Sequence, residues 1–190
     1  KNGHKDSSIR ALAAQANFEL GRYEKAAAHY RLAVAADQKS PDLRMGLAVC
    51  LWELGQWDEA RNAARAAARL GAPEADHLYV QTLCDARTGE PANTMLPKVV
   101  SLLKTRPGDK RLMFILAECY YKTGRPDLAG PWFRTLKDMQ DADEMTYLYL
   151  VSVAESLGDE SAAIAACAEY LDRYPDNSSI RKEYVDKLMN

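Results

Sequence analysis

Apolar positions recur at helical spacing along most of the chain, and glycines interrupt them at a regular interval. These glycines follow one another at spacings of 34, 34, 35 and 34 residues: Gly21, Gly55, Gly89, Gly124 and Gly158. Roughly 14 residues with helical apolar periodicity lie on each side of every glycine. Glycine enters the left-handed conformation that ends a helix without steric cost, so each unit is predicted to be a helix, a tight turn and a second helix.

The residues around the glycines repeat as well, since residues 19–26 (ELGRYEKA) align with residues 53–60 (ELGQWDEA). The period and these residues resemble the tetratricopeptide repeat (TPR) family, in which the turn glycine is repeat position 15. The family's small residues at positions 8 and 20 fall mostly on alanine here: Ala14, Ala48, Thr82, Ala117 and Val151, then Ala26, Ala60, Thr94, Ala129 and Ala163. Small side chains at these positions let two helices approach closely.

The resemblance implies an all-α fold, a right-handed α-solenoid of about five TPR helix-turn-helix repeats followed by a C-terminal capping helix. Eleven helices are expected. Residues 1–6 are predicted to be an N-terminal tail, with an N-cap at residues 6–8. Residues 7–176 hold the five units, placed at about 7–40, 41–74, 75–109, 110–143 and 144–177. The capping helix takes residues 177–190, and its charged residues are expected to face solvent opposite an apolar face.

The third unit departs from the pattern. Gln81 and Asp85 occupy positions that are normally apolar, and we expect a polar contact between helices there rather than a catalytic pair. Pro97 lies six residues after Pro91 and is predicted to kink or delay the second helix of this unit. Two interpretations stay open: a local irregularity in a degenerate repeat, or a hinge.

Composition and charge exclude several classes of function. With 47% apolar residues among 190, the chain can bury a substantial core. Its 25 basic and 27 acidic residues are spread evenly over both halves, so no basic arm favours nucleic acid. No apolar run approaches the ~18 residues of a membrane span, so no membrane insertion is expected. The sequence starts at Lys1 without a signal pattern, which leaves open that it is cut from a longer chain.

No catalytic residue, metal site or cofactor is predicted. Cys50, Cys84 and Cys119 share repeat position 10, so neighbouring thiols are expected to be a helix-packing distance apart, too far to share one metal ion. They and Cys167 are interpreted as buried, unpaired core residues. Reduced thiols favour a cytoplasmic location, with a periplasmic one as the alternative if the chain is cut from a longer exported protein.

In the TPR family, positions 2, 5, 6, 9, 12 and 13 of the first helices line a concave surface where partner peptides bind. The resemblance implies an apolar and aromatic groove at these positions, formed by Met45, Val49, Trp52, Tyr79, Leu83, Arg87, Arg111, Phe114, Glu118, Tyr121, Lys122 and Tyr149. The alternative is that curvature of the stack or a self-contact buries some of these aromatic residues. Contiguous exposed apolar surface usually marks a binding site.

The favoured hypothesis is a non-catalytic scaffold or adaptor that binds a protein or peptide segment with apolar anchors in this groove. Arg87, Arg111 and Lys122 are expected to orient acidic groups of the partner at its rim. The alternative hypothesis is a structural assembly or self-association element of a larger bacterial secretion or envelope complex, and homo-oligomerisation stays open. The Ala-rich and Arg-rich composition favours a bacterial source.

Overall fold

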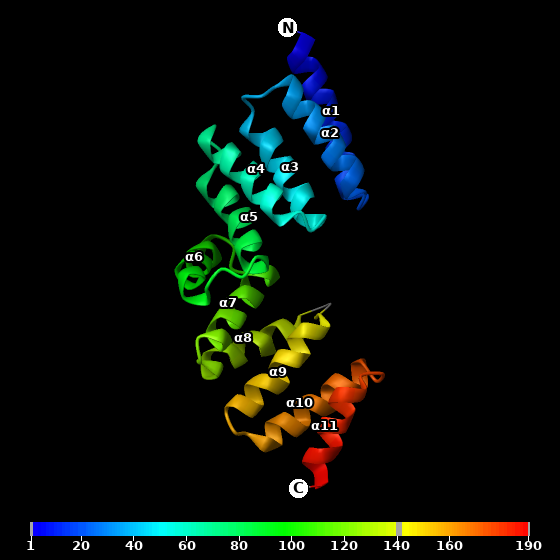
Figure 1. Ribbon diagram of the computed structural model, residues 1–190, viewed down its shortest axis with the longest axis vertical. Coiled ribbons are helices and arrows are strands. Elements are labelled where there is room, and N and C mark those ends of the chain that lie inside the picture. The colour runs from blue at the N-terminus through cyan, green and yellow to red at the C-terminus, as the bar shows by residue number, and fades with distance from the viewer. Residues whose placement is uncertain (1, 140–141, 190) are drawn as a thin grey trace. The chain divides into compact units, whose positions relative to one another are not determined.

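The structure is a computed structural model that describes residues 2–139 and 142–189, and these form α-helices with no β-strand. The predicted all-α class is confirmed, and so is the number of eleven helices within the described residues. The helices, drawn in Figure 1, are α1 (Asn2–Glu19), α2 (Tyr23–Ala36), α3 (Pro41–Glu53), α4 (Trp57–Arg69), α5 (Glu74–Arg87), α6 (Ala92–Thr105), α7 (Lys110–Lys122), α8 (Pro126–Asp138), α9 (Glu144–Ser156), α10 (Glu160–Arg173) and α11 (Ser178–Met189).

The chain divides into two compact units. Unit 1 is Lys1–Glu90 with α1 to α5, and unit 2 is Pro91–Asn190 with α6 to α11. The boundary falls inside the third predicted repeat, since α5 belongs to unit 1 and α6 to unit 2. The repeat with polar residues at apolar positions is thus the one whose two helices belong to different units.

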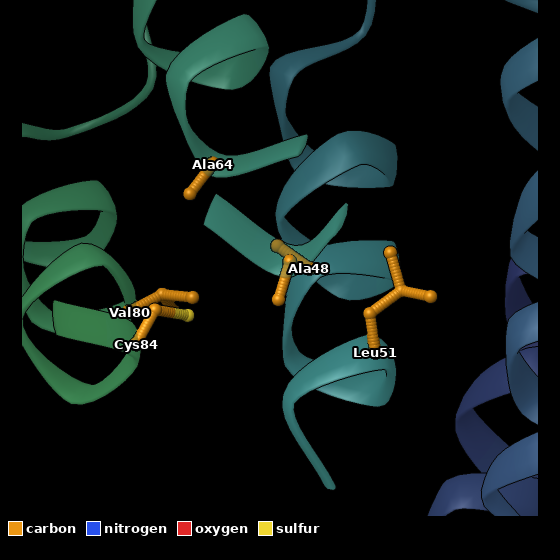
Figure 2. Close-up of a cluster of buried hydrophobic side chains, with 6 residues drawn as sticks. Ala48, Leu51, Ala64, Val80 and Cys84 are labelled. Atoms are coloured by element: carbon orange, nitrogen blue, oxygen red, sulfur yellow. The ribbon is translucent and has the colours of Figure 1, made fainter. Parts of the chain in front are cut away.

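Close packing through small residues builds each unit. Within a unit, every helix packs against the next one along the chain, and in unit 1 the first helices of successive repeats also touch, α1 with α3 and α3 with α5. The alanines expected at the close contacts are at most 1% exposed: Ala14, Ala26, Ala48, Ala60, Ala117, Ala129 and Ala163. Figure 2 shows one such contact, where Ala48 of α3 lies opposite Val80 and Cys84 of α5.

The repeat glycines have the backbone conformation that the sequence predicted. Their φ angles are positive, at 68° for Gly21, 73° for Gly55, 82° for Gly89, 74° for Gly124 and 68° for Gly158. A side chain is strained in this region, so the turn between the helices of each repeat depends on glycine. Gly71, outside the 34-residue period, also has a positive φ of 90° and lies between α4 and α5.

Two local predictions were wrong. The segment expected as a tail belongs to α1, which begins at Asn2. Residues 6–8 lie inside this helix and are not a cap: Asp6 forms an ion pair with Arg10 at 2.9 Å, and Ser7 is buried. Helix α6 starts before Pro97 and continues through it, so the predicted delay of the helix is wrong, whereas the alternative, a kink at Pro97, stays a prediction. Burial of one face of α6 outweighs the hydrogen bond that the proline removes.

The C-terminal helix α11 forms as predicted, but its apolar residues are only partly covered. None of its residues is fully buried, and its apolar Leu188 and Met189 are 56% and 81% exposed. Ile180 and Tyr184 are half-buried, and so are two of its charged residues, Glu183 and Lys187. Lys187 Nζ lies 2.8 Å from Glu155 Oε1 of α9, and the Cys167 thiol of α10 lies 3.8 Å from Glu183 Oε1. The expectation that the charged residues of this helix face solvent holds for Arg181, Lys182 and Asp186, which are exposed, and is wrong for Glu183 and Lys187.

The polar contact expected in the third repeat is present. Asp85 Oδ1 of α5 lies 3.1 Å from Arg61 Nε of α4, and the two side chains are 14% and 19% exposed. Gln81 bonds within its own helix, to His77 Nδ1 at 3.1 Å. Asp85 thus joins α5 to α4 in unit 1 by charge, at a repeat position that is Leu51 in the second repeat.

We predict that Asp85→Asn lowers the free energy of unfolding by about 2 kcal/mol, because the shielded Arg61 guanidinium loses its buried partner. Asp58→Asn is the matched control: it removes a carboxylate 3.4 Å from the same guanidinium, but Asp58 is 82% exposed. Its expected loss is about 0.5 kcal/mol. Urea unfolding followed by circular dichroism measures both, and equal losses would contradict the inter-helix role of Asp85.

Candidate functional site

The residues predicted to line a groove lie on first helices of the repeats but in two separate units. Unit 1 holds Met45, Val49, Trp52, Tyr79, Leu83 and Arg87 on α3 and α5, and these form the unit-1 surface. Unit 2 holds Arg111, Phe114, Glu118, Tyr121, Lys122 and Tyr149 on α7 and α9, and these form the unit-2 surface. Each surface is a candidate site in its own right.

On the unit-1 surface, α3 begins where Ser40 Oγ accepts a hydrogen bond from the Leu43 N–H at 3.3 Å. Met45, Val49 and Trp52 then follow at spacings of four and three residues, which places them on one stripe of the helix. All three are half-buried against the cluster of Figure 2. Their side chains are shared between the core and the surface.

The residues that α5 contributes to the unit-1 surface differ in their exposure to solvent. Tyr79 is half-buried against the same cluster, and Arg87 is exposed. Leu83 is only 3% exposed, so its expected place on the groove surface is wrong, because it packs inside unit 1. Tyr30 of α2 covers Gly46, at a groove position of α3: a Cβ on Gly46 would lie 2.4 Å from Tyr30 Cζ. Much of this surface is used for internal packing.

The unit-2 surface is built around an aromatic cluster. Tyr149 of α9 stacks on Phe133 of α8, with ring centroids 4.7 Å apart and planes 6° from parallel. Phe114 and Tyr121 of α7 meet Tyr149 edge to face at 5.7 and 5.5 Å. Phe133 is fully buried, whereas the other three are half-buried. A buried ring therefore supports three partly exposed rings from two neighbouring first helices.

Hydrogen bonds fix the polar edge of this cluster. The Tyr149 hydroxyl donates to Glu118 Oε1 at 2.8 Å, and Lys122 Nζ lies 2.9 Å from the same oxygen. Ser156 Oγ donates to the Tyr121 hydroxyl at 3.3 Å. Burial, and then the bond to Glu118, raise the pKa of Tyr149 well above its usual range, so the phenol stays neutral. Lys122 is exposed and pairs with Glu118, and Arg111 is a second exposed cation of this surface.

Sequence reasoning missed one residue that belongs with this surface. Met145 is 49% exposed and lies one helical turn before Tyr149 on α9. It occurs 34 residues after Arg111 and therefore has the same repeat position 2. The period itself was the signal that would have found it. Met145 is the most exposed apolar side chain associated with the unit-2 surface.

A shallow depression on α8, α9 and α10 is lined by Lys137, Tyr147, Glu169, Asp172 and Arg173. Lys137 Nζ and Glu169 Oε2 form an ion pair across 2.7 Å, so two of its charges satisfy each other. None of the predicted groove residues lies there. Its charged lining does not suit an apolar partner.

The four cysteines are buried and unpaired, as predicted. Burial raises the pKa of each thiol, Cys50, Cys84, Cys119 and Cys167, from 9.0 to about 11. Such thiols hold little thiolate at neutral pH and are poor nucleophiles. Among the described residues, no three His, Cys, Asp or Glu side chains are grouped so as to hold a metal ion.

Stacked helix pairs with glycine turns and close-packing alanines define a helical-repeat protein. Family models described as tetratricopeptide repeat match residues 17–84 and residues 98–144. The chain therefore belongs to the tetratricopeptide repeat family. Proteins of this family are interaction modules that bind protein partners and are generally non-catalytic. A comparison with curated proteins gives no match.

Solved structures of TPR proteins share the fold. YrrB, described as a TPR protein with an unusual peptide-binding site, is 17% identical with a TM-score of 0.67, over 92% of this chain and 89% of that one. MamA (41-end) from Desulfovibrio magneticus RS-1 is 13% identical with a TM-score of 0.69, over 91% and 97%. PilW, a widely conserved type IV pilus biogenesis factor, is 17% identical with a TM-score of 0.68, over 94% and 82%.

Over residues 2–139 and 142–189, no helix has the length and apolar composition needed to cross a bilayer.

We predict that the four thiols react slowly with Ellman's reagent in the native chain at pH 8. A pKa about two units above the free value lowers the thiolate fraction by about 100-fold, and burial adds a steric barrier. In guanidinium chloride all four are expected to react at the rate of free cysteine. A native chain that reacts equally fast would contradict the burial of these side chains.

Proposed function

We propose that the chain is a non-catalytic scaffold or adaptor that binds a segment of a partner protein, with the unit-2 surface as its main site. The single observation that carries this proposal is the set of three half-exposed rings held over buried Phe133, with Met145 exposed beside them. A surface that is rigid, apolar and partly open suits apolar anchor residues of a partner.

The polar groups of this surface support the same function. Glu118 already holds the Tyr149 hydroxyl and the Lys122 ammonium, and Tyr121 already accepts from Ser156. A partner side chain can therefore cover the rings without leaving these groups unpaired. The exposed guanidinium of Arg111 is expected to attract an acidic group of the partner at the rim.

The expected affinity is moderate. Three or four apolar anchors buried on the rings and Met145 contribute roughly 1.5–3 kcal/mol each, and ordering the partner segment offsets part of this. The balance corresponds to a dissociation constant of about 1 μM. The unit-1 surface, with half-buried Met45, Val49 and Trp52, is a second and weaker apolar site in this proposal.

Several observations favour binding over catalysis and over nucleic acid. The buried thiols have pKa values of about 11, which suits core packing rather than nucleophilic attack. The net charge of −2 offers no electrostatic attraction for phosphate backbones. Unpaired cysteines favour a reducing, cytoplasmic setting. The fold shared with YrrB, described as having a peptide-binding site, is in keeping with a peptide partner.

The test uses a defined probe. Peptides of about 15 residues are selected from a phage-displayed library against the whole chain, and the tightest is synthesised with a fluorescent label for anisotropy titration. We expect Met145→Ser and Tyr121→Ala to weaken its binding by about tenfold or more, because each removes an apolar contact. Trp52→Ala is expected to change binding less, since Trp52 lies on the unit-1 surface.

Val100→Ser is the matched control, because Val100 is 39% exposed on α6 of the same unit but outside the unit-2 surface. It should leave binding unchanged. Circular dichroism checks that the helices remain, and Met145→Ser is informative even if Tyr121→Ala loosens the cluster. Selected peptides that bind Met145→Ser and Tyr121→Ala as tightly as the unaltered chain would show that the unit-2 surface is not the site.

A further inference from the structure

Exposed apolar side chains concentrate on two helices that the proposed function does not use. The five most exposed large apolar side chains of the described residues belong to α1, to the turn that follows it, and to α11: Met189 (81%), Leu12 (68%), Leu20 (63%), Ile9 (59%) and Leu188 (56%). Isolated exposed leucines are ordinary on protein surfaces, but a concentration of this kind marks an interaction site.

The residues on α1 form one continuous stripe. Ile9, Leu12, Ala16 and Leu20 follow one another at spacings of three and four residues, and we call this stripe the α1 face. Packing inside unit 1 uses other residues of the helix, among them Ala14, which is fully buried. The α1 face is therefore not part of the core of unit 1.

The residues on α11 are exposed because of how this helix docks. Glu183 and Lys187 turn toward Glu155 and Cys167, so Val185, Leu188 and Met189 are left outward, and we call these three the α11 face. Helix α11 begins 34 residues after α9, so it takes the place of the first helix of a further repeat. Elsewhere in the chain first helices pack against the second helix of their own repeat, as α7 does with α8 and α9 with α10.

We propose that the α1 face of one copy packs on the α11 face of a second copy, with the two helices antiparallel. The arrangement of charge favours a second copy of the chain as the partner and the antiparallel direction of the two helices. Antiparallel alignment brings exposed Glu19, at the C-terminal end of α1, beside exposed Lys182, near the N-terminal start of α11. Parallel alignment would instead place Glu19 away from Lys182 and put Arg10, which is paired with Asp6 at 2.9 Å, in its place.

Such a contact is heterologous, because it joins two different faces. Each copy that binds through α1 leaves its own α11 face open, so the assembly continues beyond a dimer. One helix pair buries less than the ~1,600 Å² of a standard interface, so the association is weak, with a dissociation constant of about 100 μM. The inference is independent of the proposed peptide site, since no residue is shared.

Sedimentation velocity of the whole chain over a range of concentrations tests this contact. The unaltered chain is expected to form dimers and larger species as its concentration rises above about 100 μM. Leu12→Glu blocks the α1 face and Leu188→Glu blocks the α11 face, so each variant alone stays monomeric. Mixed in equal amounts, the two variants keep one open face each and form a dimer that cannot grow.

Leu32→Glu is the control, because Leu32 is 50% exposed on α2, outside both faces, and it should associate like the unaltered chain. All three positions are exposed, so circular dichroism should show unchanged helix content. Three results would overturn the inference: a monomeric unaltered chain at all concentrations, a single variant that still associates alone, or a mixture that stays monomeric. Peptide binding at the unit-2 surface should be the same in all variants.

Discussion

Close approach of neighbouring helices through alanine is the constraint on which the structure depends. No helix pair of this length can bury its apolar stripe alone, so each needs a neighbour at short distance. Fully buried Ala48, Ala60 and Ala64 meet that need in unit 1, and Ala117 and Ala129 in unit 2. Because small residues fill the contacts between helices, large side chains lie outside those contacts. The aromatic cluster of the unit-2 surface is formed from them.

The third repeat shows what happens when this constraint is relaxed. Thr94 stands where other repeats have a buried alanine, and it is exposed. Asp85 stands at a normally apolar position and makes an ion pair with Arg61 of the preceding helix. An ion pair holds α5 within unit 1 but gives it no apolar face for a following helix. The division of the chain within this repeat agrees with these two substitutions.

The sequence predicted what depends on local chemistry. Phased glycines gave the turns, since a positive φ is a property of one residue, and phased alanines gave the close contacts. Position within a repeat did not predict how exposure is shared among large side chains. Leu83 is buried while Val49, at the same repeat position, is half-buried, because exposure depends on which neighbour covers each helix. The hydrogen bond from Tyr149 to Glu118 joins residues 31 positions apart in the sequence, so it could not be predicted from local sequence either.

The mixed docking of α11 has a consequence for how unit 2 responds to its solvent. Charged contacts such as Lys187 with Glu155, on side chains that are 22% and 42% exposed, hold this helix together with half-buried Ile180 and Tyr184. Dissolved ions screen attraction between partly exposed charges, whereas excluded salts such as sulfate strengthen apolar contacts. Rising sulfate concentration therefore weakens the charged contacts of α11 while it strengthens the apolar contacts of unit 2, so the two kinds of contact that hold the last helix respond to this salt in opposite directions.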